Sequence, residues 1–512
     1  MTGNADDRAP RPDAAGGTLG MSPDEAAATD VPAANVPATN VPATDVPAAV
    51  ADPRRLGVAT WVIAFARFLV VLDGTIMIVA LPSIQDALKI SPANLNWVIN
   101  AYSLTFGGLM LVAGRAGDLY GRKRVFRIGL VLFGAASLLG GLAPTGAALI
   151  GFRAVQGIGA AIATPGALSL LVATFPEGRH RTRALGLYGG MTGLASVMGL
   201  VLGGVLTTYV SWRWVLLVNV PVIIGVLLGV GALDEGGPAA RTRIDVPGAV
   251  TATLGAGSLV YAVDRVGEHG WSDAVVIGFL AASAVLLAAF AALQRTGRTP
   301  MIPREVVGDR GRVGANVVTL LMSTGSFATY YFLTLYMQQV LGYSALRTGL
   351  MYLPLAVGFG IAAGGVGPQL LARTSERVAL SLALALAAAG TAWFCFLTAH
   401  SGVYTVMLPA SLVTGLGLGA TVVVATGIGV RGIDGSEAGI GSALLTAGSQ
   451  IGGALGLAGL ATVAVTTTEH AVKGTPLADA LVHGYTAGFK VAVGLYLLGI
   501  VVSLATITRN AG

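Results

Sequence analysis

Apolar segments of about 18 to 25 residues recur along this chain from Val58 to its end, and each can cross about 30 Å of hydrocarbon as a helix. Of the 512 residues, 54% are hydrophobic and only 11% are charged, whereas ordinary globular chains carry about 25% charged residues. The sequence therefore predicts an all-α integral membrane protein with about 14 transmembrane helices. The predicted segments lie near residues 58–81, 95–116, 125–143, 147–172, 185–208, 213–233, 246–264, 273–294, 313–341, 347–371, 378–399, 404–428, 440–466 and 486–508.

Basic residues divide unevenly between the two sets of connecting loops. One set holds the clusters within 122–127, 179–183, 241–243, 295–312 and 373–377. The other set holds little beyond Lys89, Arg213, Arg265, Arg347 and Lys473. Cytoplasmic loops carry the excess of Lys and Arg, and an even number of helices returns the chain to the side on which it began. We therefore expect a multi-pass protein of a bacterial plasma membrane with both termini cytoplasmic, bacterial because the chain is rich in Ala, Gly and Arg and poor in Lys.

The apolar segments divide the chain into four regions. Residues 1–56 form an Ala/Pro-rich cytoplasmic tail in which the pattern VPAANVPATNVPATDVPAA repeats every five residues, a composition that predicts disorder. It lacks the apolar core of a signal peptide. Six helices are predicted over 57–233, two inserted helices and a basic cytoplasmic loop over 234–312, and six helices over 313–508. Two six-helix bundles around a midplane site are typical of transporters, although no clear sequence repeat relates these halves.

Several function classes lack the residues that they require. The sole cysteine, Cys395, excludes disulfides within the chain and a thiolate metal cluster. The five histidines fall in or beside polar connections, and no nucleophile occurs with a base and an orienting partner. The net charge of +6 is scattered through short loops, which fits orientation in a membrane better than binding to nucleic acid. We predict a protein that is not an enzyme and that uses no metal or cofactor.

The stretch LDGTIMIVALP, residues 72–82, places Asp73 inside the first predicted helix. A charge near the centre of a membrane helix costs about 2.5 to 3.5 kcal/mol on insertion scales, so such residues generally face a cavity and serve a function. A carboxylate in a partly dry cavity can change its charge as access to water changes, which is what a proton carrier requires. The structural alternative is a pairing with Arg67, but six residues along a helix rotate two side chains by about 240°, away from a shared face.

The stretch GRAGDLYGRKRVF, residues 114–126, ends the second predicted helix and enters the third. Gly114 allows close helix contact, Asp118 stands at the helix end, and Gly121 permits a tight turn before a run of basic residues. The carboxylate can pair with those cations or with a neighbouring helix N-terminus, which would make a breakable latch. The alternative is a helix stop followed by a cytoplasmic anchor.

These stretches resemble the motifs of a known family. GRAGDLYGRKRV resembles the signature cytoplasmic loop of the major facilitator superfamily, and LIGFRAVQGIGAA (149–161) resembles its fourth-helix motif. LDGTIMIVALPSI resembles the first-helix motif of the fourteen-helix drug:proton antiporter family, and WRWVLLVNVP (212–221) resembles that family's entry into the sixth helix. With FLTLYMQQVLGYSALRTGLMYLP and GIGSALLTAGSQIGGALG in the second half, the likeness covers residues 57–508.

The resemblance implies a secondary active transporter that exports drugs or other hydrophobic or cationic small molecules by alternating access, driven by the proton gradient without a cofactor. It implies that Asp73 is the coupling acid and that Arg153 takes part in proton coupling; the alternative for Arg153 is an arginine that reaches the outer headgroups. It assigns cytoplasmic gating to the loop residues Gly114, Arg115, Asp118, Gly121, Arg122, Lys123 and Arg124.

The chain also departs from the family pattern at three positions. Ile78 stands where members commonly have Asn, and Leu119 stands where a basic residue is usual. The fifth-helix antiporter motif usually carries Gly-Pro, whereas here Gly199 is followed by Leu200. Loss of the proline removes a bend and weakens the transfer of the antiport mechanism. It leaves three glycines for close helix packing, Gly199, Gly203 and Gly204.

Substrate contacts are predicted from polar and amphipathic side chains on the helices. Amides and aromatic rings mixed with Met and Leu suit a roomy, adaptable pocket. The alternative for any one of them is an interhelical hydrogen bond worth about 0.6 kcal/mol. These residues are Asn100, Tyr102, Gln156, Tyr331, Gln338, Gln339 and Gln450.

The predicted partners are a small-molecule substrate, protons and the lipid bilayer; the oligomeric state stays open, and a monomer is compatible with the sequence. One alternative is a carrier of a single metabolite, in either direction. Another is a non-transporting membrane sensor, which would require an ordered output domain where this chain has only its low-complexity tail.

Overall fold

The computed structural model describes residues 53–91, 94–175, 179–235, 245–297, 302, 308–431 and 438–507. These residues contain helices and turns and no strand. The predicted disordered tail lies outside the described residues up to residue 52, and the first helix begins at Pro53, slightly before the predicted boundary at residue 56.

The N-terminal half comprises six passes. They are α1 (Pro53–Leu88), α2 (Trp97–Tyr120), α3 (Arg122–Gly141), α4 (Gly146–Thr174), α5 (Arg179–Tyr209), and a sixth pass made of α6 (Trp214–Leu217), α7 (Asn219–Gly229) and η2 (Val230–Ala232). Two further helices follow, α8 (Val246–His269) and α9 (Ala274–Thr296).

The C-terminal half also comprises six passes, several of them interrupted by π-helical turns. They are α11 (Arg310–Leu335) with η3 (Tyr336–Val340); α12 (Ala345–Met351), α13 (Leu353–Ile361), η4 (Ala362–Val366) and α14 (Gly367–Arg373); α15 (Glu376–Phe394); η5 (Val403–Met407) with α16 (Leu408–Val430); α17 (Ala438–Val472); and α18 (Leu477–Thr506).

The prediction of about fourteen membrane-spanning helices is confirmed. Thirteen helical stretches in the described residues are long and apolar enough to cross a membrane, and α5, with 31 residues, makes the fourteenth pass. The last helix begins at Leu477, nine residues before the predicted start at 486. That extension reads LADALVHGY, and its polar residues hid the start from an argument based on apolar length.

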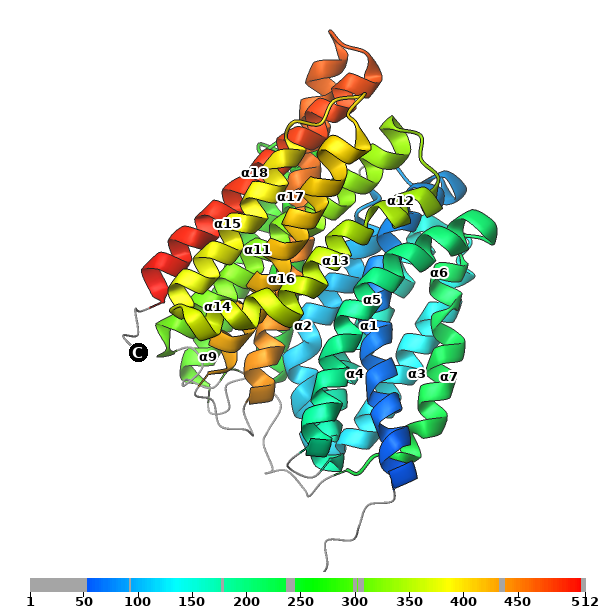
Figure 1. Cartoon of the computed structure of the whole chain (residues 1–512), viewed down its shortest axis with the longest axis vertical. Coiled ribbons are helices and arrows are strands. Elements are labelled where there is room, and N and C mark those ends of the chain that lie inside the picture. The colour runs from blue at the N-terminus through cyan, green and yellow to red at the C-terminus, as the bar shows by residue number, and fades with distance from the viewer. Residues whose placement is uncertain are drawn as a thin grey trace, which may run out of the picture. The chain divides into compact units, whose positions relative to one another are not determined.

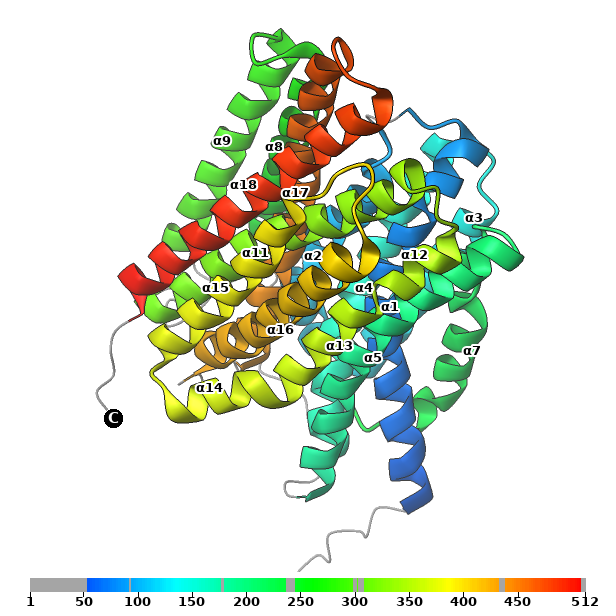
Figure 2. The same ribbon diagram turned by 45° about the horizontal axis from the view of Figure 1, so that its top comes forward.

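The helices of each half pack mainly with one another. In Figure 1, α1, α3, α4, α5 and α7 lie together, and α11, α15, α16 and α18 form a neighbouring group. The inserted helices α8 and α9 pack on each other, and α8 also packs on both α2 and α17 (Figure 2). The inserted pair therefore covers a line along which the two halves meet.

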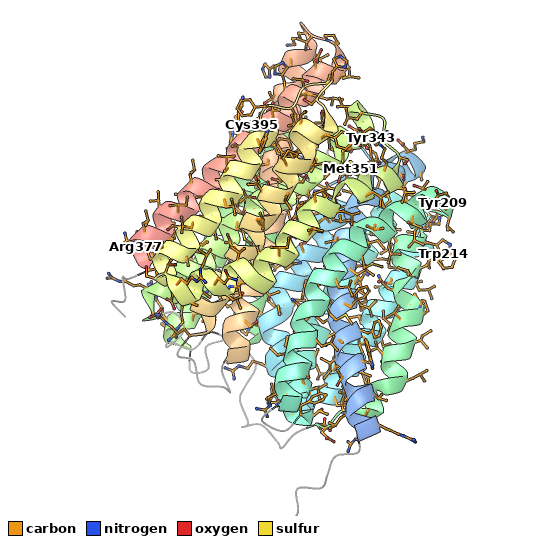
Figure 3. The ribbon with its side chains drawn as sticks, in the orientation of Figure 1. Tyr209, Trp214, Tyr343, Met351, Arg377 and Cys395 are labelled. Atoms are coloured by element: carbon orange, nitrogen blue, oxygen red, sulfur yellow. The ribbon has the colours of Figure 1, made fainter. Side chains whose placement is uncertain are left out.

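The passes define two sides of the molecule. We call the side at which α1 begins and α18 ends the terminal side, and the opposite side the distal side. Figure 3 shows Tyr209 and Trp214 at the α5–α6 connection on the distal side, with Tyr343 and Met351 nearby. It also shows Arg377 and Cys395 at opposite ends of α15.

Glycines bring α5 close to its neighbours in the distal half. A Cβ atom on Gly203 would lie 2.6 Å from the carbonyl oxygen of Ile76 in α1. A Cβ atom on Gly204 would lie 2.6 Å from the carbonyl oxygen of Ala345 in α12. Backbones that approach this closely leave no room for a side chain, so α5 joins the two halves at this level.

Candidate functional site

Asp73 lies at the centre of a polar network inside the N-terminal half. Its carboxylate is fully buried and accepts three hydrogen bonds from side chains. Arg153 Nη1 donates to Oδ2 at 2.5 Å, while Gln156 Nε2 and Asn219 Nδ2 donate to Oδ1 at 2.7 and 2.9 Å. The donors come from α4 and α7, so the network joins three helices at one point.

Arg153 is fixed by contacts on several sides. Its Nε donates to the Val98 carbonyl oxygen at 3.0 Å, and its Nη1 also donates to Gln156 Oε1 at 2.6 Å. Its guanidinium carbon lies 4.3 Å from the centre of the Tyr102 ring, within the range of a cation–π interaction. The side chain is 1% exposed, so the alternative that Arg153 reaches the outer headgroups is wrong.

Ser137 extends the network to α3. Its hydroxyl oxygen accepts from Gln156 Nε2 at 2.6 Å and lies 3.3 Å from Asn219 Nδ2. Ser137, Gln156 and Asn219 are fully buried. The three polar side chains therefore surround one anion and one cation, whose charges sum to zero. Hydrogen bonds of this kind offset the cost of taking an ion pair out of water.

The arrangement is suited to a change of charge at a single atom. All three groups donate hydrogen bonds to the Asp73 carboxylate, and Arg153 also carries a positive charge. A proton on Asp73 would cancel the negative charge beside a buried guanidinium that keeps its own charge. The helices α1 and α4 would then lose the ionic component of their contact.

Arg67, the alternative partner of Asp73, lies elsewhere. Its guanidinium carbon is 5.4 Å from the centre of the Tyr188 ring on α5. The described contacts of the Asp73 carboxylate are with Arg153, Gln156 and Asn219. The helical rotation argument for separating Asp73 from Arg67 therefore agrees with the structure.

The loop between α2 and α3 makes a contact that the sequence did not indicate. Gly121 has a φ of +92°, which favours glycine, and the chain reverses there. Lys123 Nζ then donates to the carbonyl oxygens of Gly231 and Leu233, at 3.1 and 2.8 Å, at the end of η2. A cation at a helix C-terminus satisfies carbonyls that lack helical partners.

The predicted latch on Asp118 stays a prediction, because that side chain lies outside the described residues. A Cβ atom on Gly114 would lie in ordinary van der Waals contact with Pro165 of α4. Arg115 and Arg122 are half-buried and Arg124 is exposed.

The three glycines predicted for close packing lie on α5. A Cβ atom on Gly199 would overlap the Thr75 side chain of α1. Gly203 and Gly204 face α1 and α12 as described above. Leu200, at the position where the family has proline, is buried, and its carbonyl oxygen lies where a Cβ on Gly349 of α12 would be. Close backbone contact is therefore present without the proline.

Two of the predicted substrate residues line a cavity on the distal side. This cavity, the distal chamber, has a volume of about 280 Å³ and contains Tyr331 and Gln339 in its wall. It is enclosed by residues of α1, α8, α11, η3, α17 and α18 and of the turn that precedes α2, including Asn96, Asp264, Tyr331, Leu335, Thr462 and Tyr485. Tyr485 donates to Gln339 Oε1 at 2.9 Å.

The other predicted substrate residues lie in different surroundings. Tyr102 and Gln156 belong to the Asp73 network. Gln338 donates to the Val79 carbonyl oxygen at 3.0 Å and so joins η3 to α1. Gln450 packs on α2 beside Gly107. Asn100 is fully buried, and neither of its amide atoms has a hydrogen-bond partner in the described part of the chain.

Sequence reasoning missed several polar residues. Ser137 lies in the apolar run GAASLLGG, where a small hydroxyl resembles a packing residue, and Asn219 lies inside the quoted stretch WRWVLLVNVP. Asp264 stands at the end of the predicted segment 246–264, a position that does not mark it as an intramembrane acid. The helix α8 continues beyond Asp264 to His269, so this acid lies within the helix and not at its end.

Comparison with known proteins places the chain in a family. The family model of the Major Facilitator Superfamily matches residues 63–457, so the chain belongs to this superfamily of membrane transporters. A puromycin resistance protein of Streptomyces alboniger is 40% identical, over 87% of this chain and 90% of its own. A cephamycin export protein of Amycolatopsis lactamdurans is 39% identical, over 85% of this chain and 89% of its own.

The solved structures agree on the fold. A bacterial homologue of the human lysosomal transporter Spinster, in an inward-facing and unoccupied conformation, superimposes with a TM-score of 0.62 at 16% identity. The match covers 90% of this chain and all of the other. Identity at this level supports the shared fold alone.

Proposed function

We propose that this transporter exports small organic molecules from the bacterial cytoplasm in exchange for protons. The observation that carries the coupling is the Asp73 network, in which one buried carboxylate is held by one buried guanidinium and two amides. Export as the direction of transport is supported by the names of the puromycin resistance and cephamycin export relatives. Both termini are assigned to the cytoplasm because the described basic residues at 122–127, 295, 310–312 and 373–377 lie on the terminal side.

In the proposed cycle, Asp73 exchanges its proton for the interaction with Arg153. A proton that enters from the distal side neutralises Asp73 and releases α4 from its ionic contact with α1. Loss of the proton to the cytoplasm restores the ion pair that the structure contains. Substrate and proton then drive opposite transitions of the same two halves, which is what antiport by alternating access requires.

The test measures uptake of a fluorescent cationic dye, ethidium, into inverted membrane vesicles under an imposed pH gradient. We expect gradient-dependent uptake with the native chain and none with Asp73→Asn. Exchange of labelled for unlabelled dye without a gradient should persist in Asp73→Asn, because exchange requires the conformational change but no net movement of protons.

Comparison of gradient-driven uptake with gradient-free exchange distinguishes a loss of proton coupling from a loss of the folded, moving protein. Gradient-driven uptake by Asp73→Asn equal to that of the native chain would place the coupling group elsewhere. Loss of both uptake and exchange in a variant that still folds would assign Asp73 a structural role. If the native chain moved no dye but transported a single metabolite, the narrow-substrate alternative would replace broad drug export.

A further inference from the structure

The distal chamber lies outside the Asp73 network and has a wall suited to an organic ligand. Tyr331 and Phe332 are buried in α11, and their ring centres lie 5.6 Å apart in an edge-to-face arrangement. The rings of Phe332 and Tyr485 are stacked with their centres 5.9 Å apart. Together with Leu95 and Leu335, these rings give a mostly apolar surface. At about 280 Å³, the chamber is at the small end of ligand pockets, which measure about 300 to 1,000 Å³.

One carboxylate in the wall comes from the inserted helix α8. Asp264 accepts hydrogen bonds from Asn96 Nδ2 at 2.5 Å and from Trp97 Nε1 at 2.6 Å. These donors hold the carboxylate in a fixed orientation beside the cavity. A second carboxylate, Glu469 of α17, lies at the exposed edge of the same cavity. Negative charge beside aromatic faces favours a cation over a neutral molecule of the same shape.

The wall also contains a hydrogen-bond acceptor without a donor. Asn96 is 2% exposed, and its Oδ1 has no hydrogen-bond partner in the described part of the chain. Buried acceptors of this kind are few in native structures, because an unsatisfied polar atom is costly. Asn96 lines the chamber, so a bound ligand that carries an N–H group could donate to this oxygen, whereas a quaternary ammonium could not.

The chamber also depends on contacts between the halves. Thr462 of α17 donates to the Val263 carbonyl oxygen of α8 at 3.2 Å. Val263 is the neighbour of Asp264, which accepts from Asn96 and Trp97 of the N-terminal half. The carboxylate is thus positioned by both halves, and its surroundings change when they move apart. We propose that the distal chamber binds small protonated organic amines and that Asp264 recognises their charge. The chamber's place on an export path rests on the proposed function, but binding itself does not.

The experiment measures binding of N,N-dimethylbenzylamine to the purified full chain in lipid nanodiscs at pH 7 by saturation-transfer NMR. Its neutral analogue N,N-dimethylbenzamide and the quaternary benzyltrimethylammonium ion serve as comparison ligands. We expect the protonated amine to bind more tightly than the quaternary ion, and the neutral amide to bind most weakly. Asp264→Asn should weaken amine binding about tenfold or more, because a charge-assisted contact is lost.

Three further variants distinguish binding in the chamber from general effects on the protein. Ala461→Phe fills the chamber without changing any charge and should abolish amine binding. Asp273→Asn removes a carboxylate of the same helical hairpin that lies outside the chamber wall and should leave binding unchanged. Asp264→Glu should restore part of the binding that Asp264→Asn loses.

The outcomes test the distal chamber and the proposed function separately. Equal binding of the amine to the native chain and to a folded Asp264→Asn variant would overturn the role of Asp264, and equal binding in Ala461→Phe would place the site elsewhere. Equal affinities of the protonated and quaternary ions would overturn the role of Asn96. Amine binding without gradient-driven transport would overturn only the proposed function. Gradient-driven transport without amine binding would overturn only the chamber.

Discussion

Arg153 and Asp73 are joined inside the N-terminal half by an ion pair in which Nη1 lies 2.5 Å from Oδ2 and both side chains are at most 1% exposed. Removal of one member leaves the other as a buried uncompensated charge. We expect Asp73→Asn and Arg153→Gln each to lower the free energy of unfolding by about 3 to 5 kcal/mol.

The double variant provides the control. When both charges are removed together, no unpaired ion remains, so the combined loss should be smaller than the sum of the two single losses. The free energy of unfolding is measured by titration with dodecyl sulfate in detergent for the native chain, the two single variants and the double variant. Additive losses would mean that the pair contributes little beyond two independent side chains.

Asn219 is the donor to Asp73 that comes from α7, and its removal tests the amide part of the network. Asn219→Leu removes the hydrogen bond of 2.9 Å and leaves one carboxylate oxygen with a single donor. We expect a loss of about 1 to 3 kcal/mol in stability and a lower rate of gradient-driven uptake.

Asn316→Leu is the matched control for Asn219→Leu. Its Nδ2 donates to the Arg312 carbonyl oxygen at 2.9 Å in its own helix, away from Asp73. The control should leave the ratio of gradient-driven uptake to passive exchange unchanged. If Asn219→Leu also left that ratio unchanged, the amide would be a packing residue and not part of the coupling site.

The sequence predicted the fold and the two charged members of the site for different physical reasons. Fourteen passes followed from segment length, because hydrocarbon thickness sets a minimum for each helix. Asp73 and Arg153 were conspicuous because charges are rare in such segments. Ser137 and Asn219 were missed because single small polar residues occur in membrane helices for packing as often as for chemistry.

The distal chamber could not be predicted from the sequence. Asn96 caps α2, whereas Asp264 lies in α8 and Tyr485 in α18, and only the packing of the inserted helix against both halves brings them together. The seven polar residues predicted as substrate contacts share only their position on predicted helices. Helical position gives no information on which neighbouring helix a side chain faces, so the group divides between the network, the chamber and helix contacts.

The stability of the fold should depend on pH through Asp273, which lies at the distal end of the inserted helices α8 and α9. Its carboxylate pairs with Arg265 Nε at 3.2 Å and accepts from the Val276 amide at 3.0 Å, and these interactions hold its pKa below the usual range. A carboxyl whose pKa is lower in the folded state stabilises the fold above its unfolded pKa of about 3.9. That stabilising contribution disappears as the pH falls through the pKa that Asp273 has in the folded state.

The measurement compares the thermal midpoints of the native chain and Asp273→Asn. The native chain should unfold at a higher temperature at pH 7, and the difference should shrink as the pH falls below about 4. A difference that stayed constant between pH 7 and pH 3 would attribute the effect to packing and not to the charge.

Gly204 on α5 lies where the two halves pack closely on the distal side. A Cβ atom there would lie 2.6 Å from the Ala345 carbonyl oxygen and 2.8 Å from the Leu346 Cα atom, both in backbone that cannot move aside cheaply. Alanine in place of an unstrained helical glycine normally stabilises a helix by about 0.5 to 1 kcal/mol. We expect the opposite for Gly204→Ala, with the distal contact between α5 and α12 disfavoured.

Gly225→Ala is the matched control, since no atom lies within 4 Å of a Cβ at that glycine. The readout is disulfide formation between Thr208→Cys and Leu346→Cys in a chain that also carries Cys395→Ser, because the Leu346 amide donates to Thr208 Oγ1 at 3.0 Å in the native contact. Gly204→Ala should lower the yield of this cross-link and slow transport, whereas Gly225→Ala should change neither. Since alternating access requires the distal contact to form and break in each cycle, an unchanged yield in Gly204→Ala would show that this glycine contact does not control the approach of the two halves.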